Sequence, residues 1–246
     1  MFLKMLIYGR PGIGKTYLLG TGAEDPRLTP AIMIDLEGGL MTIASKVKRY
    51  ENIAALKKAV AENVELAPIN AIRIKSSTDL SQIVNYLYDN NGKHPFKAVY
   101  VDSLTEINYL KLQAAAANNP KNTTGFPQLN DYGTSAAQMR SLIRDFRDMD
   151  ECHVIFTAHY SESKDEQTGR VEIKPSLTGK LVGEVCGMLD IVGLLDMEKD
   201  GTRTIRFQPT DRVWAKDRSE GGKLGEVITN ATMSQILDAL ESSQTA

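Results

Sequence analysis

The sequence predicts an α/β fold with a mainly parallel, twisted sheet and helices on both faces. Short, continuous apolar runs are typical of strands that are buried on both faces. Amphipathic segments between several of these runs are typical of helices that cover such a sheet. The chain has 246 residues, of which 42% are hydrophobic and 24% are charged. It is therefore long enough to bury a substantial core.

The apolar runs predict six strands, at residues 3–8, 31–35, 71–74, 97–102, 153–158 and 190–195. Apolar residues recur at helical spacing over 80–87, 104–114 and 139–146, which predicts three helices. A last helix is expected over 233–240, before a polar tail. We expect one domain over residues 1–230, followed by a C-terminal helix and tail at 231–246.

The C-terminal third also contains segments of a different kind. TRTIRF (202–207) followed by RVWAK (212–216), with turn residues between them, predicts a C-terminal antiparallel hairpin. The segments 118–131 and 160–180 are long and polar. Loops of this length in a compact domain are usually functional or disordered.

Charge and cysteine content restrict the classes of partner. The formal net charge is −2, so no overall positive field draws the chain to nucleic acid, and any such contact needs a local patch. Cys152 and Cys186 stand beside apolar runs far apart in the chain, which is typical of reduced, buried thiols. No apolar run is long enough to span a membrane. We therefore expect a cytoplasmic protein without a membrane partner.

The strongest motif is GRPGIGKT at residues 9–16, which satisfies the pattern G-x-x-x-x-G-K-[ST]. It follows an apolar strand and precedes a segment that can form a helix. In such loops, backbone N–H groups surround a phosphate, the lysine binds the β- and γ-phosphates, and the hydroxyl binds Mg²⁺. The motif predicts a site for ATP and Mg²⁺, with Thr16 as a metal ligand. The residues expected to contact the nucleotide are Gly9, Arg10, Pro11, Gly12, Ile13, Gly14, Lys15, Thr16 and Tyr17.

Asp102 ends the apolar strand of KAVYVDSLTEI. Open α/β sheets hold their ligands at the carboxyl ends of their strands. A carboxylate there is expected to hold Mg²⁺ through its water shell. Asp102 or Ser103 is also a good helix N-cap, and the two roles are compatible.

Glu37, in AIMIDLEGG, is the candidate general base. It stands just past a strand, where a carboxylate can orient and deprotonate the attacking water. Asp35 competes for this role; strand alternation predicts that both carboxylates lie on one side, with Glu37 nearer the end. The alternative for Glu37 is a solvated loop acid. His159 ends HVIFTAHY and either senses the γ-phosphate or is an ordinary hydrogen-bonding histidine at a strand end.

The order of these elements resembles the RecA-like P-loop ATPase core. IMIDLEGGL looks like the segment that carries the catalytic Glu in RecA, and VYVDSLTEI looks like its Walker B strand. With the WAKDR run at 214–218, the chain resembles the phage RecA-like nucleotide-binding proteins of the Sak group, which are single-strand annealing ATPases. The resemblance covers roughly residues 1–228.

The resemblance implies a Mg²⁺-dependent, DNA-stimulated ATPase that supports phage DNA annealing and recombination in the bacterial cytoplasm. It implies a homo-oligomer, either a ring or a filament, with ATP bound between subunits, and it allows a single-strand binding protein as a partner. Lys216 and Arg218, two apart on a strand, would share a face and reach the γ-phosphate of a neighbouring subunit. The alternative is a solvated basic strand edge.

The same resemblance implies that the segments 118–131 and 160–180 contact single-stranded DNA. Phe126 or Tyr132 would then stack on bases, unless they anchor their own loop. In the second segment, Lys164, Arg170, Lys174 and Lys180 are balanced by Glu162, Asp165, Glu166 and Glu172. Two further hypotheses remain open: a P-loop kinase that phosphorylates a small molecule, and a nucleotide-gated interaction module without DNA coupling.

Overall fold

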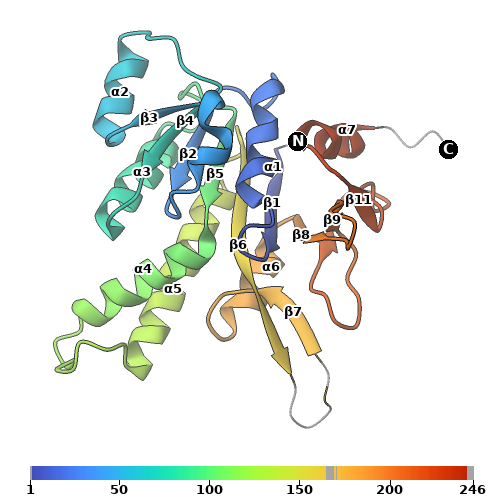
Figure 1. The fold of residues 1–246 in the computed structure, drawn as a ribbon. Coiled ribbons are helices and arrows are strands. Elements are labelled where there is room, and N and C mark those ends of the chain that lie inside the picture. The colour runs from blue at the N-terminus through green and yellow to red at the C-terminus, as the bar shows by residue number, and fades with distance from the viewer. Residues whose placement is uncertain (1, 165–168, 170, 243–246) are drawn as a thin grey trace.

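The computed structural model describes residues 2–164, 169 and 171–242, and it contains a central sheet covered by helices on both faces (Figure 1). Within the described residues the sheet has eleven strands. They are β1 (Lys4–Gly9), β2 (Ala31–Asp35), β3 (Val47–Tyr50), β4 (Ile69–Arg73), β5 (Ala98–Asp102), β6 (His153–Lys164), β7 (Val171–Pro175), β8 (Ile191–Met197), β9 (Arg203–Arg206), β10 (Lys216–Asp217) and β11 (Val227–Thr229).

The main path of the sheet runs in the order β3-β4-β2-β5-β6-β1-β8-β9-β11. All neighbours from β3 to β8 are parallel, while β8–β9 and β9–β11 are antiparallel. The strands of the parallel part that carry continuous apolar runs are buried along their length, as expected for a sheet covered on both faces. The predicted α/β class, with a mainly parallel sheet and a C-terminal antiparallel hairpin, is confirmed.

Each face of the sheet has its own core because side chains alternate along the strands. In β1, Leu6 and Tyr8 join one buried cluster, while Met5 and Ile7 join the other. The first cluster packs against α2 (Ile53–Ala61), α3 (Ser77–Asp89), α4 (Leu104–Ala117), α5 (Leu129–Arg147) and α6 (Leu181–Met188). The second packs against α1 (Lys15–Thr21), the 3₁₀ segment η2 (Leu40–Lys46) and α7 (Met233–Glu241).

The partners within the C-terminal hairpin differ from the prediction. The expected pairing of 202–207 with 212–216 was wrong: β9 pairs with β8 and β11, and β10 pairs with the start of β8. Residue Val213 instead bridges Ile173 on β7. A turn between two extended segments does not fix their partner, since both segments can pair with the same free edge of β8.

The polar segment 160–180 is not a simple loop. β6 continues to Lys164 and β7 returns beside it in an antiparallel register, so the two form an arm that leaves the sheet (Figure 1). Both faces of the arm lie largely outside the core, so its strands carry polar residues and lack the apolar run of a buried strand. In the other polar segment, the loop ends at Gln128, where a capping box starts α5.

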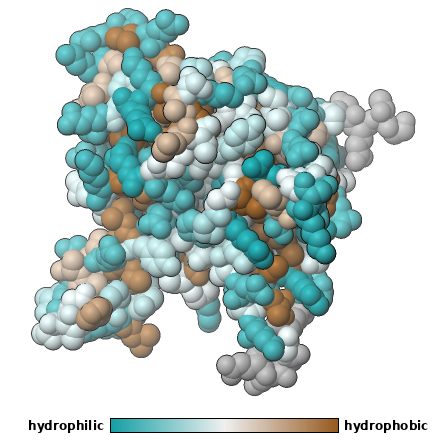
Figure 2. Space-filling view, in the orientation of Figure 1, coloured by the Kyte–Doolittle hydropathy of each residue, from teal (hydrophilic) through white to brown (hydrophobic). Residues whose placement is uncertain are grey.

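The α4–α5 hairpin forms a second projection beside the arm (Figure 1). Apolar side chains gather on this projection in the space-filling view (Figure 2), in agreement with the exposure of Phe126 and Leu129. Both cysteines are free, with Cys152 buried and Cys186 half-buried. None of the helices in the described part of the chain combines the length and apolar character needed to cross a membrane.

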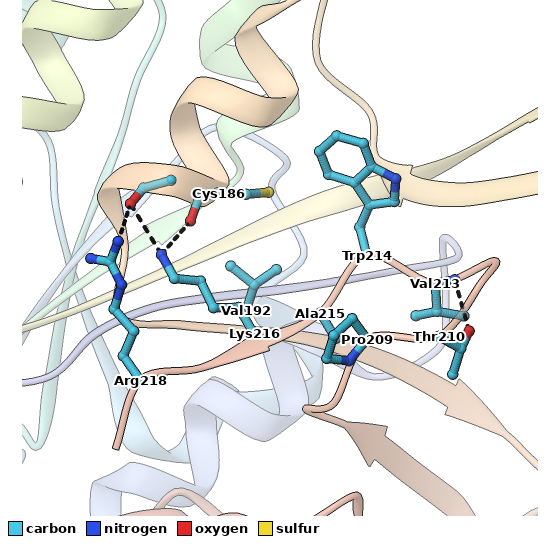
Figure 3. Close-up of a pocket in the computed structure, with 10 residues that line it drawn as sticks. Cys186, Val192, Pro209, Thr210, Val213, Trp214, Ala215, Lys216 and Arg218 are labelled. Atoms are coloured by element: carbon cyan, nitrogen blue, oxygen red, sulfur yellow. Dashed lines mark hydrogen bonds between the residues drawn. The ribbon is translucent and has the colours of Figure 1, made fainter. Parts of the chain in front are cut away.

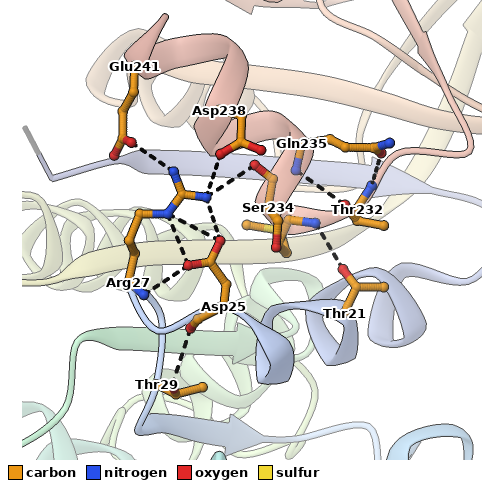
Figure 4. A network of polar contacts seen from close by, with 10 residues as sticks. Thr21, Asp25, Arg27, Thr29, Thr232, Ser234, Gln235, Asp238 and Glu241 are labelled. Carbon is orange, nitrogen blue, oxygen red and sulfur yellow. Dashed lines mark hydrogen bonds and ion pairs between the residues drawn. The ribbon is translucent and has the colours of Figure 1, made fainter.

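The C-terminal helix α7 is fixed to the body of the protein by a polar network around Arg27 (Figure 4). The Arg27 guanidinium pairs with the buried Asp25 and with Asp238 and Glu241 on α7. The division of the chain at residues 1–230 and 231–246 stays a prediction, and residues 243–246 of the expected tail lie outside the described residues.

Candidate functional site

The loop between β1 and α1 has a backbone that only glycine suits at several positions. A Cβ atom on Gly9 would lie 2.4 Å from the carbonyl oxygen of Leu195, so β1 and β8 can approach only with glycine there. Gly12 and Gly14 have φ values of 76° and 109°, in the region that side chains rarely adopt. α1 then begins at Lys15, so the loop and the first helical turn present their N–H groups together.

Lys15 lies across this loop. Its side chain is buried, and Nζ donates hydrogen bonds to the carbonyl oxygens of Gly9 and Arg10, at 3.2 and 3.1 Å. Burial lowers the pKa of Lys15, while the charges of Glu37 and Asp102 act in the opposite direction. An ammonium held in this way is placed to bind phosphate oxygens that enter the loop.

Asp102 is fully buried at the end of β5 and accepts two hydroxyl hydrogen bonds. Thr16 Oγ1 donates to Oδ2 at 2.7 Å, and Thr157 Oγ1 donates to Oδ1. Burial raises the pKa of Asp102 above its usual range, and both hydroxyl contacts oppose that rise. The cap of α4 is Ser103, which accepts from the backbone N–H of Glu106. The Asp102 carboxylate and the Thr16 hydroxyl are hard oxygen donors side by side, which fits a Mg²⁺ ion.

The strand order explains how these groups meet. β6 lies between the loop strand β1 and the Asp102 strand β5, with His159 beside Gly9 in the register. Its side chains at Thr157 and His159 therefore stand between the phosphate loop and Asp102. The sequence analysis missed Thr157, although its position two residues before His159 on the same strand gave the signal.

Glu37 and His159 contact each other at the mouth of the loop. Glu37 Oε1 lies 3.1 Å from His159 Nε2, and both side chains are about one quarter exposed, at 22% and 24%. The Glu37 backbone N–H donates to the Asp102 carbonyl at 3.3 Å, which keeps this segment beside the Asp102 strand. The carboxylate is thus within the site and partly open to water, as a general base must be.

Asp35 occupies a different environment. It is buried, accepts a hydrogen bond from the Gly38 backbone N–H at 2.6 Å, and pairs with Arg73 at 3.3 Å. β2 ends at Asp35, so Glu37 lies beyond the strand, and the prediction that both carboxylates share one side stays a prediction. Asp35 shapes the turn that presents Glu37.

Lys216 and Arg218 share a face, and they do not lie at their own chain's phosphate loop. Lys216 Nζ donates to the carbonyl oxygens of Cys186 and Gly187, at 2.9 and 3.0 Å, and Arg218 Nη2 donates to Gly187 at 3.1 Å (Figure 3). Lys216 Nζ also donates to the Leu189 carbonyl at 2.6 Å. Cations at a helix C-terminus stabilise its unpaired carbonyls. Both line a cavity of about 500 Å³ that also includes Trp214.

The sheet register shows how far this pair is from the loop. β10 pairs with Ile191 and Val192, at the beginning of β8. The phosphate loop follows the opposite end of β1, where Tyr8 pairs with Leu194. The reading of this pair as a solvated strand edge is incomplete, since the two side chains bind the end of α6.

Two further contacts with the loop have no signal in the sequence. Arg203, on β9, donates from Nε to the Ile13 carbonyl at 2.9 Å and stacks over the Tyr17 ring at 5.7 Å. Arg10 lies over the ring of Tyr160 on β6, at 5.2 Å. Each joins residues about 150 or more positions apart, so only the fold brings them together.

Four of the described residues expected to contact DNA lie on the two projections, namely Phe126, Tyr132, Lys164 and Lys174, whereas Lys180 is at the start of α6. Phe126 is 76% exposed and Tyr132 is 43% exposed, so neither is an anchor buried in its own loop. Lys174 is paired with Glu172 at 3.2 Å and lies over Trp214. Asp165, Glu166 and Arg170, which entered the charge balance of the arm, lie outside the described residues.

Comparison with known proteins agrees with this arrangement. A family model described as an AAA domain matches residues 1–219, which run from β1 through β10 and include the phosphate loop and Asp102. A search of curated proteins finds no match. The family match covers most of the chain, and the loop, the buried Asp and their strand order are those of a nucleotide-binding core. The chain therefore belongs to the AAA domain family of P-loop ATPases.

Proposed function

We propose that the chain is a Mg²⁺-dependent, RecA-like ATPase of the Sak single-strand annealing group, which binds single-stranded DNA and supports phage DNA annealing and recombination. The observation that carries this proposal is the continuity of β6. One strand runs from the sheet, through the residue that contacts the candidate base, into the projecting arm.

His159 stands where β6 leaves the sheet, and its neighbours tie it to both ends of that path. Its backbone N–H donates to Thr105 Oγ1 at 3.0 Å, and its carbonyl accepts from the Ser176 N–H at 2.8 Å, at the base of the arm. The next residue, Tyr160, stacks against Arg10 of the phosphate loop. A DNA contact that moves the arm therefore acts on both the Glu37–His159 contact and the loop.

The chemistry follows from the groups within the site. Lys15 binds the β- and γ-phosphates, and Glu37, once released by His159, orients the attacking water and accepts its proton. Thr16 and Asp102 would hold Mg²⁺, which neutralises phosphate charge when bound. His159 acts through Glu37 and is a positioning residue.

The site is proposed to be shared between subunits. Lys216 and Arg218 act together and lie at the far end of the sheet from their own loop. In a head-to-tail ring or filament they would reach the nucleotide of the next subunit. Basic groups supplied in this way accelerate phosphoryl transfer by roughly 10³–10⁵-fold.

Single-stranded DNA is proposed to lie along the two projections, 118–131 and 160–180. The exposed aromatic rings of Phe126 and Tyr132 offer stacking surfaces for bases. A few phosphate contacts from each subunit, repeated in an oligomer, suffice without a strongly basic chain. A single-strand binding protein is a further proposed partner, and the bacterial cytoplasm is the proposed location.

The test is Mg²⁺-dependent ATP hydrolysis by the purified chain, with and without single-stranded DNA, and with Lys15→Ala as the control. DNA should raise the rate, and both EDTA and Lys15→Ala should abolish turnover. A rate that does not respond to DNA at any length or concentration would contradict the proposal. ATP turnover that requires an added small-molecule acceptor would instead favour the alternative of a P-loop kinase.

A further inference from the structure

We propose that a cavity beside the phosphate loop binds the nucleoside part of the nucleotide, and that its outer wall is supplied by the segment that leads into α7. The inference rests on the proposed binding of a nucleoside triphosphate at this loop. It adds the residues that recognise the base and the ribose.

The cavity has a volume of about 220 Å³ and lies next to the first turn of α1. Since a water molecule takes about 30 Å³ in the liquid, this space equals that of roughly seven waters, enough for a bicyclic base. Gly14, Tyr17, Leu195, Arg203, Asn230 and Thr232 are among the residues that line it.

The cavity lies on the side of β1 where the nucleoside end of a bound triphosphate is expected. Thr16, Asp102 and Glu37 stand on the β6–β5 side of β1, which places the γ-phosphate end there. β8 and β9, which carry Leu195 and Arg203, lie on the other side of β1 (Figure 1). With the γ-phosphate end on the β6–β5 side, the nucleoside is expected to lie on the β8 side, where Gly14 and Tyr17 line the cavity.

One wall is a stacking platform made by Tyr17 and Arg203. The Tyr17 side chain is 52% exposed, so its ring is available to a ligand. Arg203 lies over that ring and is fixed by its Nε–H bond to the Ile13 carbonyl, while its other guanidinium N–H groups bind no acceptor among the described residues. A Cβ on Gly14 would lie 2.9 Å from Arg203 Nε, so glycine is needed for this approach. Aromatic and guanidinium planes are surfaces on which bases stack.

Another part of the cavity wall, next to Arg203, carries a fixed amide. Asn230 has φ 46°, in the left-handed region, and its backbone N–H donates to the Arg203 carbonyl at 2.7 Å. Its Oδ1 accepts from the Arg203 backbone N–H at 3.2 Å, while its Nδ2 donates to no acceptor within the described part of the chain. An oriented amide donor beside a stacking surface suits the ring nitrogens of a purine or a ribose hydroxyl.

This wall lies outside the part of the chain that the family explains. The family model ends at residue 219, whereas Asn230, Ala231 and Thr232 come from the segment after β11. Thr232 is also the N-cap of α7, so its hydroxyl is already used by the Gln235 N–H. The Arg27 network and the bond from the Met233 N–H to Thr21 hold this segment in place (Figure 4).

The test compares ATP with inorganic tripolyphosphate, both with Mg²⁺, by titration calorimetry. Tyr17→Ala removes the platform, and Asn230→Gly removes the amide while keeping a residue that tolerates the left-handed backbone. Each variant should bind ATP about tenfold more weakly, the size expected for one lost stacking or hydrogen-bonding partner, and should bind tripolyphosphate as before. Tyr88→Ala is the matched control, because Tyr88 is 48% exposed at the far end of α3.

The outcomes separate this inference from the proposed function. If either cavity variant loses affinity for both ligands equally, or keeps its affinity for ATP, the cavity does not hold the nucleoside. Lys15→Ala should lose both ligands. If Lys15→Ala binds both as the wild type does, nucleotide binding at the loop itself fails, and the cavity inference fails with it.

Discussion

The contact between Arg27 and Asp25 makes a pH-dependent contribution to stability that one substitution can test. Asp25 is 3% exposed and accepts hydrogen bonds from Arg27 Nη2 at 2.6 Å and Nε at 3.0 Å. Hydrogen bonding from Arg27 lowers the pKa of Asp25 from 3.8 to about 2. Arg27 also binds Asp238 and Glu241, so the shift of Asp25 is the cleaner measure of this pair.

The sign of the effect follows from the direction of the shift. The pKa of Asp25 is lower in the folded protein than in the unfolded chain, so its contribution is complete well above pH 4 and is lost as the pH falls toward 2. A change from 3.8 to about 2 corresponds to about 2 kcal/mol near neutral pH. At pH 3, between the two values, about 1 kcal/mol remains.

The assay is urea unfolding of the wild type and of Arg27→Gln at several pH values from 6 to 3. The free energy of unfolding of the variant should be lower by about 2 kcal/mol at pH 6, and the gap should narrow to about 1 kcal/mol at pH 3. Comparing two proteins removes the contribution of the carboxylates that Arg27 does not contact, and Asp238 and Glu241, which it does contact, are largely exposed and contribute little. A gap that stays constant over this range would refute the reasoning. Lys46→Gln is the control, because its partner Glu24 is 76% exposed and such pairs contribute little.

Other predictions concern the site. Glu37→Gln should keep its affinity for ATP and lose at least about 100-fold in turnover. Titration should therefore show wild-type ATP binding, and a phosphate-release assay should show almost no product. His159→Ala should bind ATP normally, and single-stranded DNA should no longer raise its rate of ATP hydrolysis. An unchanged response to DNA would show that the arm does not act on Glu37 through His159. Thr157→Val should weaken Mg²⁺-dependent ATP binding, measured as a higher Mg²⁺ requirement, because one hydroxyl no longer holds Asp102. Lys216→Ala/Arg218→Ala mixed with Glu37→Gln should recover activity that neither has alone, provided that both variants assemble; no recovery at any ratio would exclude a shared site.

The parts of the fold that the sequence predicts are those governed by local patterns. The strand before Gly9 and the strand that ends at Asp102 are continuous apolar runs, and burial on both faces leaves few other structures for them. The loop motif carries its own geometry, because its glycines adopt conformations that other residues avoid. These elements could therefore be placed from the residues alone.

The rest depends on contacts between distant segments. β10 has only two residues. One edge of β8 is already paired with β1, and β10 pairs with the first residues of β8. The arm strands are polar because they lie largely outside the core, so their composition resembles that of a loop. Arg203 reaches Ile13 across 190 positions, and no spacing rule connects them. Asp35 and Glu37 are two residues apart but have different contacts, Asp35 with Arg73 and Glu37 with His159, because the strand ends between them.

The bonds of Lys216 and Arg218 to the end of α6 have a consequence for how subunits would associate. Both cations already have acceptors within their own chain. Binding a neighbour's phosphate would exchange one set of hydrogen bonds for another, so most of the gain comes from replacing neutral carbonyls by a charged group. Under the proposed shared site, a neighbour that holds ATP offers that charge and one that holds ADP offers less. Subunits would then associate reversibly, and each round of hydrolysis would loosen the contact that made it possible.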